Sequence, residues 1–188
     1  MYKKYIKRQF DIFFSLIFIL FLSPFILILI LLLYLEDGKP IFFKQQRIGK
    51  DGAIFILYKF RTMPINTQNV ESAEAADIKI KTCGRLLRRF NLDEIPQLIN
   101  IFFGEMSFVG PRPSLTSQNE LNELRKKNNI FSIKPGLTGN AQINAFDNMS
   151  NEQKVEFDLY YFKNISLFLD LYIILKTFRY LLHRPPVY

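Results

Sequence analysis

An uncharged run of 24 residues, Ile12–Leu35, constrains this chain more than any other feature. At about 1.5 Å per residue, a helix of this length reaches roughly 36 Å, enough to cross the hydrocarbon core of a bilayer. Ser23-Pro24 interrupts the run near its middle, and proline removes a backbone donor and favours a kink. Lysine and arginine flank both ends, so the positive-inside rule places both ends on the cytoplasmic side.

These features favour a re-entrant helical hairpin that enters and leaves the membrane on one face, with a spanning helix as the alternative. The break is expected at Ser23 and Pro24, where the serine hydroxyl can bond a carbonyl that proline leaves without a donor. The preceding segment, Met1–Phe10, alternates basic with aromatic and aliphatic residues. It is expected to lie on an anionic membrane surface.

The composition limits the chemistry that the chain can support. Its 188 residues are enough for one domain, and its net charge of +8 suits nucleic acid, anionic lipid or a phosphorylated substrate. A nucleic-acid partner is not expected, because the basic residues flank apolar membrane-seeking segments instead of forming a solvated stripe. Cys83 is the one cysteine, so no intrachain disulfide can form. His183 is the one histidine, so any metal would be a hard ion held by oxygen.

The rest of the chain predicts an α+β fold that is mainly helical. Apolar runs at residues 41–43 and 54–58, with turn residues Gly49–Gly52 between them, predict a small β-hairpin. Residues 65–77 are expected to form a loop and a short helix. Helices are predicted at 79–89 (with Leu86 and Leu87 facing inward), 114–129, 150–162 and 166–180. The last of these is expected to be interfacial, and an ordinary core helix is the alternative.

The sequence thus divides into two parts. Residues 1–36 are expected to form the basic N-terminus and the membrane hairpin, and residues 37–188 a cytoplasmic domain with a C-terminal interfacial helix. Residues 134–139 (KPGLTG) form a glycine-containing segment that could bring backbone N–H groups and one cation to a phosphate. Its spacing is not that of a Walker loop, so alone it is a weak signal.

The strongest chemical signal is a pair of adjacent carboxylates, Asp93 and Glu94, between basic clusters at residues 85–89 and Arg112. Arginine forks match phosphate oxygens, and a carboxylate can hold a divalent metal or act as a nucleophile. The alternative is a helix start, with Asn91 and Glu94 forming a capping box. Pro96 weakens that alternative, because it can delay the start of the helix and leave both acids just before its first turn. The nearby arginines are expected to lower both carboxyl pKa values.

Several motifs follow one another along nearly the whole chain. They are the basic N-terminus, Ser23-Pro24, Gln46-Arg47-x-Gly49, Lys59–Met63, Leu92–Gln97, Gly110–Pro113 and Lys134–Gly139. Their combination and order resemble the small monotopic bacterial phosphoglycosyl transferases, which implies that residues 37–188 are the catalytic domain. In its length the chain looks most like the undecaprenyl-phosphate diacetylbacillosamine 1-phosphate transferases of protein glycosylation.

The resemblance implies a reaction at the cytoplasmic face of the bacterial inner membrane. A sugar 1-phosphate, with UDP-N,N'-diacetylbacillosamine as the expected donor, passes to undecaprenyl phosphate and UMP is released in a ping-pong mechanism. By resemblance, Asp93 is the nucleophile and Glu94 binds Mg²⁺. Phosphates are held by Lys59, Arg88 and Arg112, and the Pro111-Arg112-Pro113 loop shapes the pocket.

Two other classes remain as alternatives. One is a non-catalytic membrane-surface protein that binds anionic lipids, which explains the ends of the chain but not the charged middle. The other is an aspartyl-phosphate phosphatase, which ordinarily needs an Asp-x-Asp spacing that is absent here.

Overall fold

A computed structural model describes residues 2–64, 81–144 and 149–183. Its longer helices are α1 (Lys7–Asp37), α2 (Thr82–Arg89), α3 (Gln97–Phe103), α4 (Asn119–Lys127), α6 (Asn151–Lys163) and α7 (Leu167–His183). Shorter turns are η1 (Tyr2–Ile6), η2 (Lys50–Gly52), η4 (Leu92–Glu94), η5 (Ile130–Ser132) and α5 (Asn140–Ile143). The strands are β1 (Phe42–Ile48), β2 (Ile54–Phe60), β3 (Ser107–Val109) and β4 (Gly136–Thr138). The element predicted at 65–77 lies outside the described residues.

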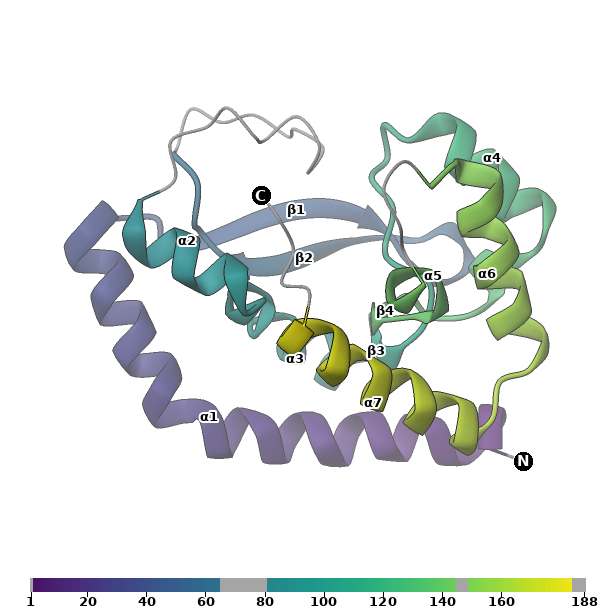
Figure 1. Ribbon diagram of the computed structural model, residues 1–188, viewed down its shortest axis with the longest axis horizontal. Coiled ribbons are helices and arrows are strands. Elements are labelled where there is room, and N and C mark those ends of the chain that lie inside the picture. The colour runs from purple at the N-terminus through teal and green to yellow at the C-terminus, as the bar shows by residue number, and fades with distance from the viewer. Residues whose placement is uncertain (1, 65–80, 145–148, 184–188) are drawn as a thin grey trace.

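The apolar run folds into one continuous helix, α1, which bends visibly between its two halves (Figure 1). Pro24 lies inside it and cannot donate to the carbonyl of Leu20, four residues earlier. The Ser23 hydroxyl donates to that carbonyl at 2.8 Å, so the predicted compensation is confirmed. By length and composition α1 could cross a membrane, which is a weak criterion for a single helix near an N-terminus. The hairpin topology stays a prediction.

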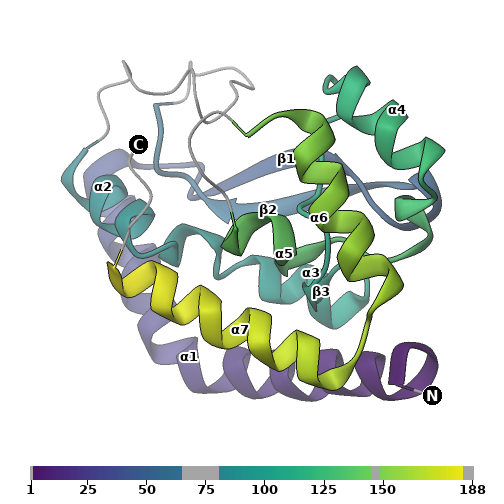
Figure 2. The ribbon, with the colours of Figure 1, turned by 45° about the vertical axis from the view of Figure 1, so that its right-hand side comes forward.

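Polar contacts hold the first half of α1 against the rest of the chain. The Arg8 guanidinium donates to the carbonyls of Ile101 and Phe102 at the end of α3, both at 2.7 Å. The buried Asp11 carboxylate accepts from the Ser107 hydroxyl and the Phe108 N–H of β3, at 3.0 and 3.1 Å. Figures 1 and 2 show the N-terminal half of α1 and helix α7 on one side of the molecule, with α3 above α1.

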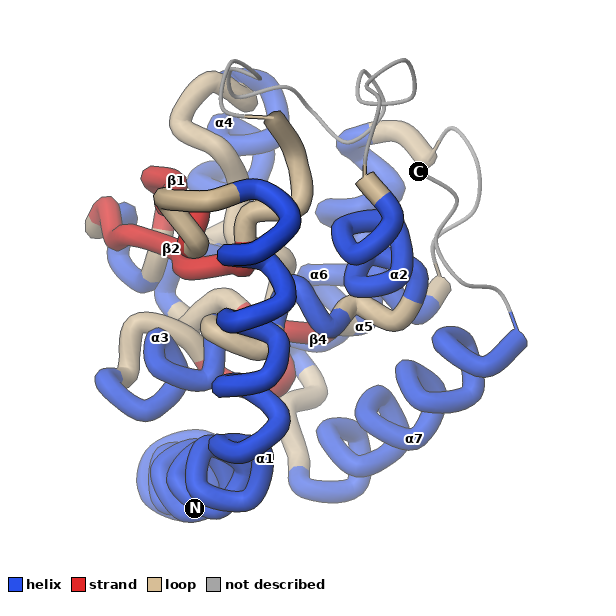
Figure 3. The backbone as a smooth tube through the Cα atoms, turned by 90° about the vertical axis from the view of Figure 1, so that its left-hand side faces the viewer, coloured by secondary structure: helices blue, strands red, loops and turns tan. Residues whose placement is uncertain are grey.

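The predicted β-hairpin is confirmed. Strands β1 and β2 pair antiparallel, from Phe42 opposite Phe60 to Ile48 opposite Ile54. The turn needs left-handed backbone at Asp51 (φ 55°) and Gly52 (φ 79°), which suits these two residue types. One face of the hairpin packs Phe55 and Leu57 against Leu98 of α3 in the main core. Figure 3 shows the hairpin above α3, with the upper half of α1 passing in front of it.

The glycine-containing segment at 134–139 includes a short strand, and its phosphate binding stays a prediction. Its residues 136–138 form β4, which pairs in parallel with β3. A Cβ on Gly136 would lie 2.0 Å from the Gly110 nitrogen, and one on Gly139 would lie 2.1 Å from the Gly110 oxygen. The glycines therefore serve close approach of two backbone segments, which sequence alone did not distinguish from phosphate binding.

The remaining helices agree with the sequence in position. Helices α2 and α4 are shorter than predicted, α6 is shifted by one residue, and α7 extends beyond the predicted end to His183. Helix α4 covers the centre of the predicted 114–129 segment, and α6 begins at a capping box formed by Ser150 and Gln153. Helix α2 begins only at Thr82 among the described residues, and of its two leucines Leu87 is buried while Leu86 is 56% exposed. The expectation that both leucines face inward was wrong for Leu86, because adjacent helical positions diverge by about 100°.

Candidate active site

The two carboxylates lie on a single turn between two helices. Helix α2 ends at Arg89, Asn91 adopts a left-handed conformation (φ 53°), and η4 then carries Asp93 and Glu94. The Asn91 backbone carbonyl accepts from the Glu94 N–H at 3.2 Å, and the Asn91 side chain makes no capping bond. The predicted capping box is therefore wrong. The interpretation that Pro96 delays the helix and leaves both acids before it is confirmed, because α3 begins at Gln97.

Glu94 is held by two cations from distant parts of the chain. Its Oε1 lies 2.7 Å from the Lys59 Nζ of β2 and 3.4 Å from an Arg112 guanidinium nitrogen. Burial alone would raise the pKa of this carboxyl, but the positive charges of Lys59 and Arg112 outweigh burial and lower the pKa to about 2. Glu94 is consequently ionised throughout the physiological range.

Asp93 behaves in the opposite way. Burial, opposed by the charge of Lys59 and reinforced by the charge of Glu94, raises its pKa to about 6. The positive charge of Arg88 lowers the pKa but does not offset the burial. The expectation that arginines would lower both pKa values was wrong for Asp93. Two adjacent acids with pKa values pushed apart are a recurring mark of a reactive site.

The structure brings the predicted site residues together from four elements. Lys59 comes from β2, Arg88 from α2, the carboxylates from η4, and Arg112 from the loop after β3. The side chains of Arg85 and Arg89 are exposed, and Lys59, Arg88 and Arg112 are among the positive charges that lower the carboxyl pKa values.

Sequence reasoning missed Asn100, which connects α3 to the strand that carries Lys59. Asn100 is completely buried. Its side-chain oxygen accepts from the Tyr58 N–H at 3.2 Å, and its side-chain nitrogen donates to the Ile56 carbonyl at 2.7 Å. The amide thus replaces a neighbouring strand along the outer edge of β2. A lone asparagine within the apolar segment Ile95–Phe103 was the available signal.

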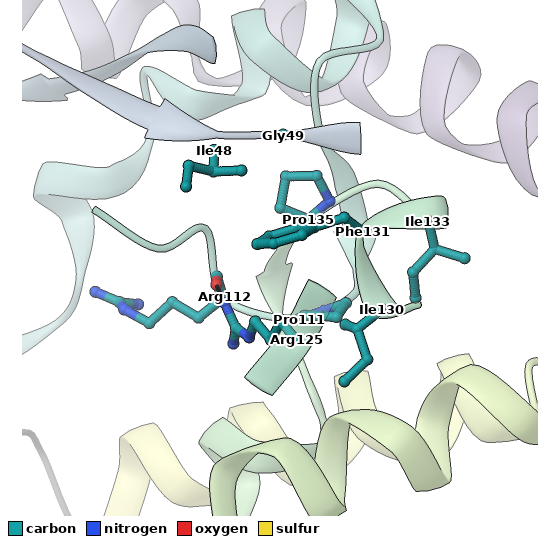
Figure 4. A pocket seen from close by; sticks show the side chains of 9 residues that line it. All are labelled: Ile48, Gly49, Pro111, Arg112, Arg125, Ile130, Phe131, Ile133 and Pro135. Atoms are coloured by element: carbon teal, nitrogen blue, oxygen red, sulfur yellow. Dashed lines mark hydrogen bonds between the residues drawn. The ribbon is translucent and has the colours of Figure 1, made fainter. Parts of the chain in front are cut away.

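The loop Pro111–Pro113 borders a small hollow of about 10 Å³ (Figure 4). Phe131 and Pro135 lie on its far side, and Arg125 lies beside the backbone of Arg112. The Arg112 side chain extends away from the hollow. The loop therefore presents Arg112 to Glu94 on the side away from the hollow.

The carboxylates fit a magnesium ion. Mg²⁺ in phosphate-transfer sites is commonly held by one or two carboxylates together with substrate phosphate oxygens. Asp93 and Glu94 provide two such groups, and the contacts of Lys59 and Arg112 with Glu94 both reach the same oxygen, Oε1. Within the described ranges, no group of three or more His, Cys, Asp or Glu residues is placed to hold a metal. Substrate oxygens would therefore have to complete the coordination.

Comparison with protein families matches residues 2–184 to the bacterial sugar transferase family. The chain belongs to this family. Membership confirms the family resemblance of the motifs and makes the protein a phosphoglycosyl transferase, which sets aside a purely lipid-binding role. The closer likeness to bacillosamine transferases stays a prediction.

Members of the family resemble the chain along most of its length. An uncharacterized sugar transferase of Bacillus subtilis, EpsL, is 40% identical over 93% of this chain and 86% of its own length. The UDP-glucose:undecaprenyl-phosphate glucose-1-phosphate transferase of Klebsiella pneumoniae is 37% identical over 91% of this chain. An N-acetylgalactosamine phosphotransferase of Aeromonas hydrophila, which acts on undecaprenyl phosphate, is 35% identical over 95%. The chain spans only 39% and 44% of these last two relatives.

Proposed function

We propose that the protein transfers a sugar 1-phosphate from a UDP-sugar to undecaprenyl phosphate and releases UMP, as a first membrane step of glycoconjugate assembly. The observation that carries the proposal is the buried carboxylate pair, in which Glu94 lies 2.7 Å from Lys59 and 3.4 Å from Arg112 and the pKa of the adjacent Asp93 is raised to about 6. The names of the relatives in Klebsiella and Aeromonas support the same reaction class.

In this mechanism Asp93 is the nucleophile. A carboxylate oxygen attacks the phosphorus that bears the sugar, and the bond from that phosphorus to the bridging oxygen of UMP breaks. UMP leaves with the bond electrons, and a phosphosugar-aspartyl intermediate remains. An oxygen of the lipid phosphate then attacks the same phosphorus and frees the Asp93 carboxylate. Splitting one transfer into two displacements gives ping-pong kinetics.

The cations around the pair offset the repulsion between an attacking carboxylate and two phosphorylated substrates. Lys59, Arg88 and Arg112 hold phosphate oxygens, and the rigid arginine forks also orient them. Glu94, with Asp93 beside it, would hold Mg²⁺, which when bound supplies further charge neutralisation of the diphosphate. The contact between Lys59 and Glu94 also keeps this carboxylate in place when the diphosphate binds.

The membrane topology belongs to the same proposal. We place α1 in one leaflet of the bacterial inner membrane, bent at Ser23-Pro24, with the catalytic part facing the cytoplasm. Apolar side chains of α1 such as Phe21 are widely exposed. Helix α7 lies on the same side of the molecule as the N-terminal half of α1 (Figure 1) and exposes Phe168, Leu171, Tyr172, Leu175 and Phe178. These faces would hold the carboxylates at the depth of a lipid phosphate.

The topology is tested by cysteine labelling. In a Cys83→Ala background, Lys3→Cys and Lys39→Cys report the two ends of α1, where both side chains are exposed. Both cysteines should react with an impermeant reagent only when it is offered from the cytoplasmic side. Labelling from opposite sides would establish a spanning helix instead.

The chemical proposal is tested with a panel of UDP-sugars and undecaprenyl phosphate. We expect UMP release with at least one donor, and UDP-N,N'-diacetylbacillosamine is the first to try. In the absence of lipid, the donor should leave a phosphosugar mass on the protein that Asp93→Asn does not acquire. A productive enzyme that never forms this adduct would contradict the intermediate, and undiminished turnover in EDTA would contradict the magnesium assignment.

A further inference from the structure

The loop Pro111–Ser114, which carries Arg112, is held through its carbonyl oxygens. Two of its residues are prolines and have no N–H to donate. The four consecutive carbonyls accept from four different groups on surrounding elements. These are the Gly136 N–H at 2.8 Å, Arg125 at 2.7 Å, Arg47 at 2.9 Å and the Ile48 N–H at 3.0 Å.

Arg125 makes the contact that acts on Arg112 itself. Its Nη1 donates to the Arg112 carbonyl, while its Nε and Nη2 donate to one oxygen of Asp158 at 3.0 and 2.6 Å. The side chains of Arg125 and Asp158 are 4% and 1% exposed. A buried guanidinium fixed by a buried carboxylate has little rotational freedom, so it offers the loop a donor at a defined position.

The Arg112 side chain is partly exposed. Its side-chain exposure is 43%, and its contact with Glu94 is long, at 3.4 Å. The hydrogen bonds to the carbonyls of Pro111–Ser114 help to fix the backbone from which the Arg112 side chain extends. A displacement of about 1 Å in a phosphate-binding group can cost about 100-fold in rate.

We propose that Arg125, locked by Asp158, is a positioning residue that sets Arg112 against Glu94 and the donor phosphates. This inference rests on the proposed function of Arg112. Arg125 acts through the backbone of another residue and does not touch the reacting atoms. Neither member of the Arg125–Asp158 pair belongs to the motifs that marked the site in the sequence.

The test separates positioning from stability. Arg125→Ala would strand a buried charge on Asp158 and endanger the fold, so the main variant replaces both partners, Arg125→Met with Asp158→Leu. Replacing a whole buried ion pair by apolar residues of similar volume is often neutral for stability. Arg125→Lys is the second variant, because an ammonium can still pair with Asp158 but lacks the fork needed to reach both acceptors. Val155→Ala is the matched control, since Val155 of α6 packs in one apolar cluster with Leu121 of α4 and is not a member of the Arg125–Asp158 pair.

Both variants should lower kcat/KM for the UDP-sugar by about 10- to 100-fold, with unchanged melting behaviour for the double variant. Val155→Ala should lower the melting temperature without this kinetic loss. Combined with Arg112→Ala, either variant should add less than about twofold to the loss from Arg112→Ala alone, because sites that act through one group are not additive.

Two results would overturn the inference: folded variants with wild-type kcat/KM, or losses that multiply fully with that of Arg112→Ala. These outcomes are distinct from a failure of the proposed function, in which the wild-type protein releases no UMP from any donor.

Discussion

Two buried aspartates show how the same side chain serves different ends in this protein. Asp170 of α7 accepts from the Tyr161 hydroxyl at 2.7 Å, the Tyr2 hydroxyl at 2.6 Å and the Lys7 ammonium at 2.5 Å. Its two oxygens thereby join η1, α1, α6 and α7. Asp93 is similarly buried, yet burial leaves its pKa raised to about 6 despite the cations nearby.

The difference lies in what compensates the burial. At Asp170, direct hydrogen bonds from three side chains offset the free-energy cost of removing the carboxylate from water. They also connect the N-terminal part of α1 to α7. At Asp93, the neighbouring charges only partly compensate, so the carboxylate keeps a basic, reactive oxygen. One aspartate is thus structural and the other chemical, although neither their residue type nor their exposure separates them.

The largest effect should come from Asp93→Asn. We expect kcat to fall by at least about 10⁴-fold, as removal of a covalent nucleophile commonly does. The fold should be retained and stabilised by ~1–3 kcal/mol at pH 7, because an amide replaces a buried carboxylate with a raised pKa. UMP release and thermal unfolding measure the two quantities. An active or destabilised Asp93→Asn protein would break the contrast with Asp170.

Glu94→Gln should reduce kcat/KM by about 10²–10³-fold, because it removes the charge that holds Lys59 and Arg112. It should also lower the pKa of Asp93, since the Glu94 charge is one of the causes that raise it. The acid limb of the pH–rate profile should consequently move to lower pH. An acid limb that stays in place would show that Glu94 does not act on Asp93.

Asp170→Asn should act on stability and leave chemistry nearly intact. It removes the charge partner of the half-buried Lys7, and breaking a buried pair commonly costs about 3 kcal/mol. Denaturant unfolding in detergent measures the loss, and kcat of the folded fraction should stay within about twofold of wild type. Tyr161→Phe, which removes one donor and no charge, is the milder control. A large loss of kcat in Asp170→Asn would contradict its structural assignment.

The pH dependence should distinguish the carboxyls without mutation. Because the folded pKa of Asp93 is raised to about 6, kcat/KM should fall about tenfold per pH unit below that value. Protonation of Asp93 also removes the cost of its buried charge, so its contribution to stability becomes less unfavourable as pH falls from 6 towards 4. Glu94, with its pKa lowered to about 2, contributes stability above its ordinary pKa and loses it as pH falls towards 2.

The fold was predictable where local pattern dominates. The apolar run with its proline, the turn residues at 49–52 and the serine before α6 each specify their element through backbone chemistry that acts over a few residues. The packing role of Gly136 and Gly139 could not be read from the sequence, because close backbone approach and phosphate binding need the same missing Cβ. Leu86 was misread because a short helix with one buried stripe leaves its neighbouring leucine outside.

The sequence by itself determined that the chain has a carboxylate pair among cations and an apolar helix interrupted by a proline, because residue type and spacing within each stretch suffice for that. Only the tertiary structure decided that Lys59 and Arg112 both reach Glu94, that Asp93 has a raised pKa, and that Arg125 holds the Arg112 carbonyl. The physical reason is that burial, hydrogen-bond geometry and charge separation depend on distances between residues far apart in the chain, which no local pattern records.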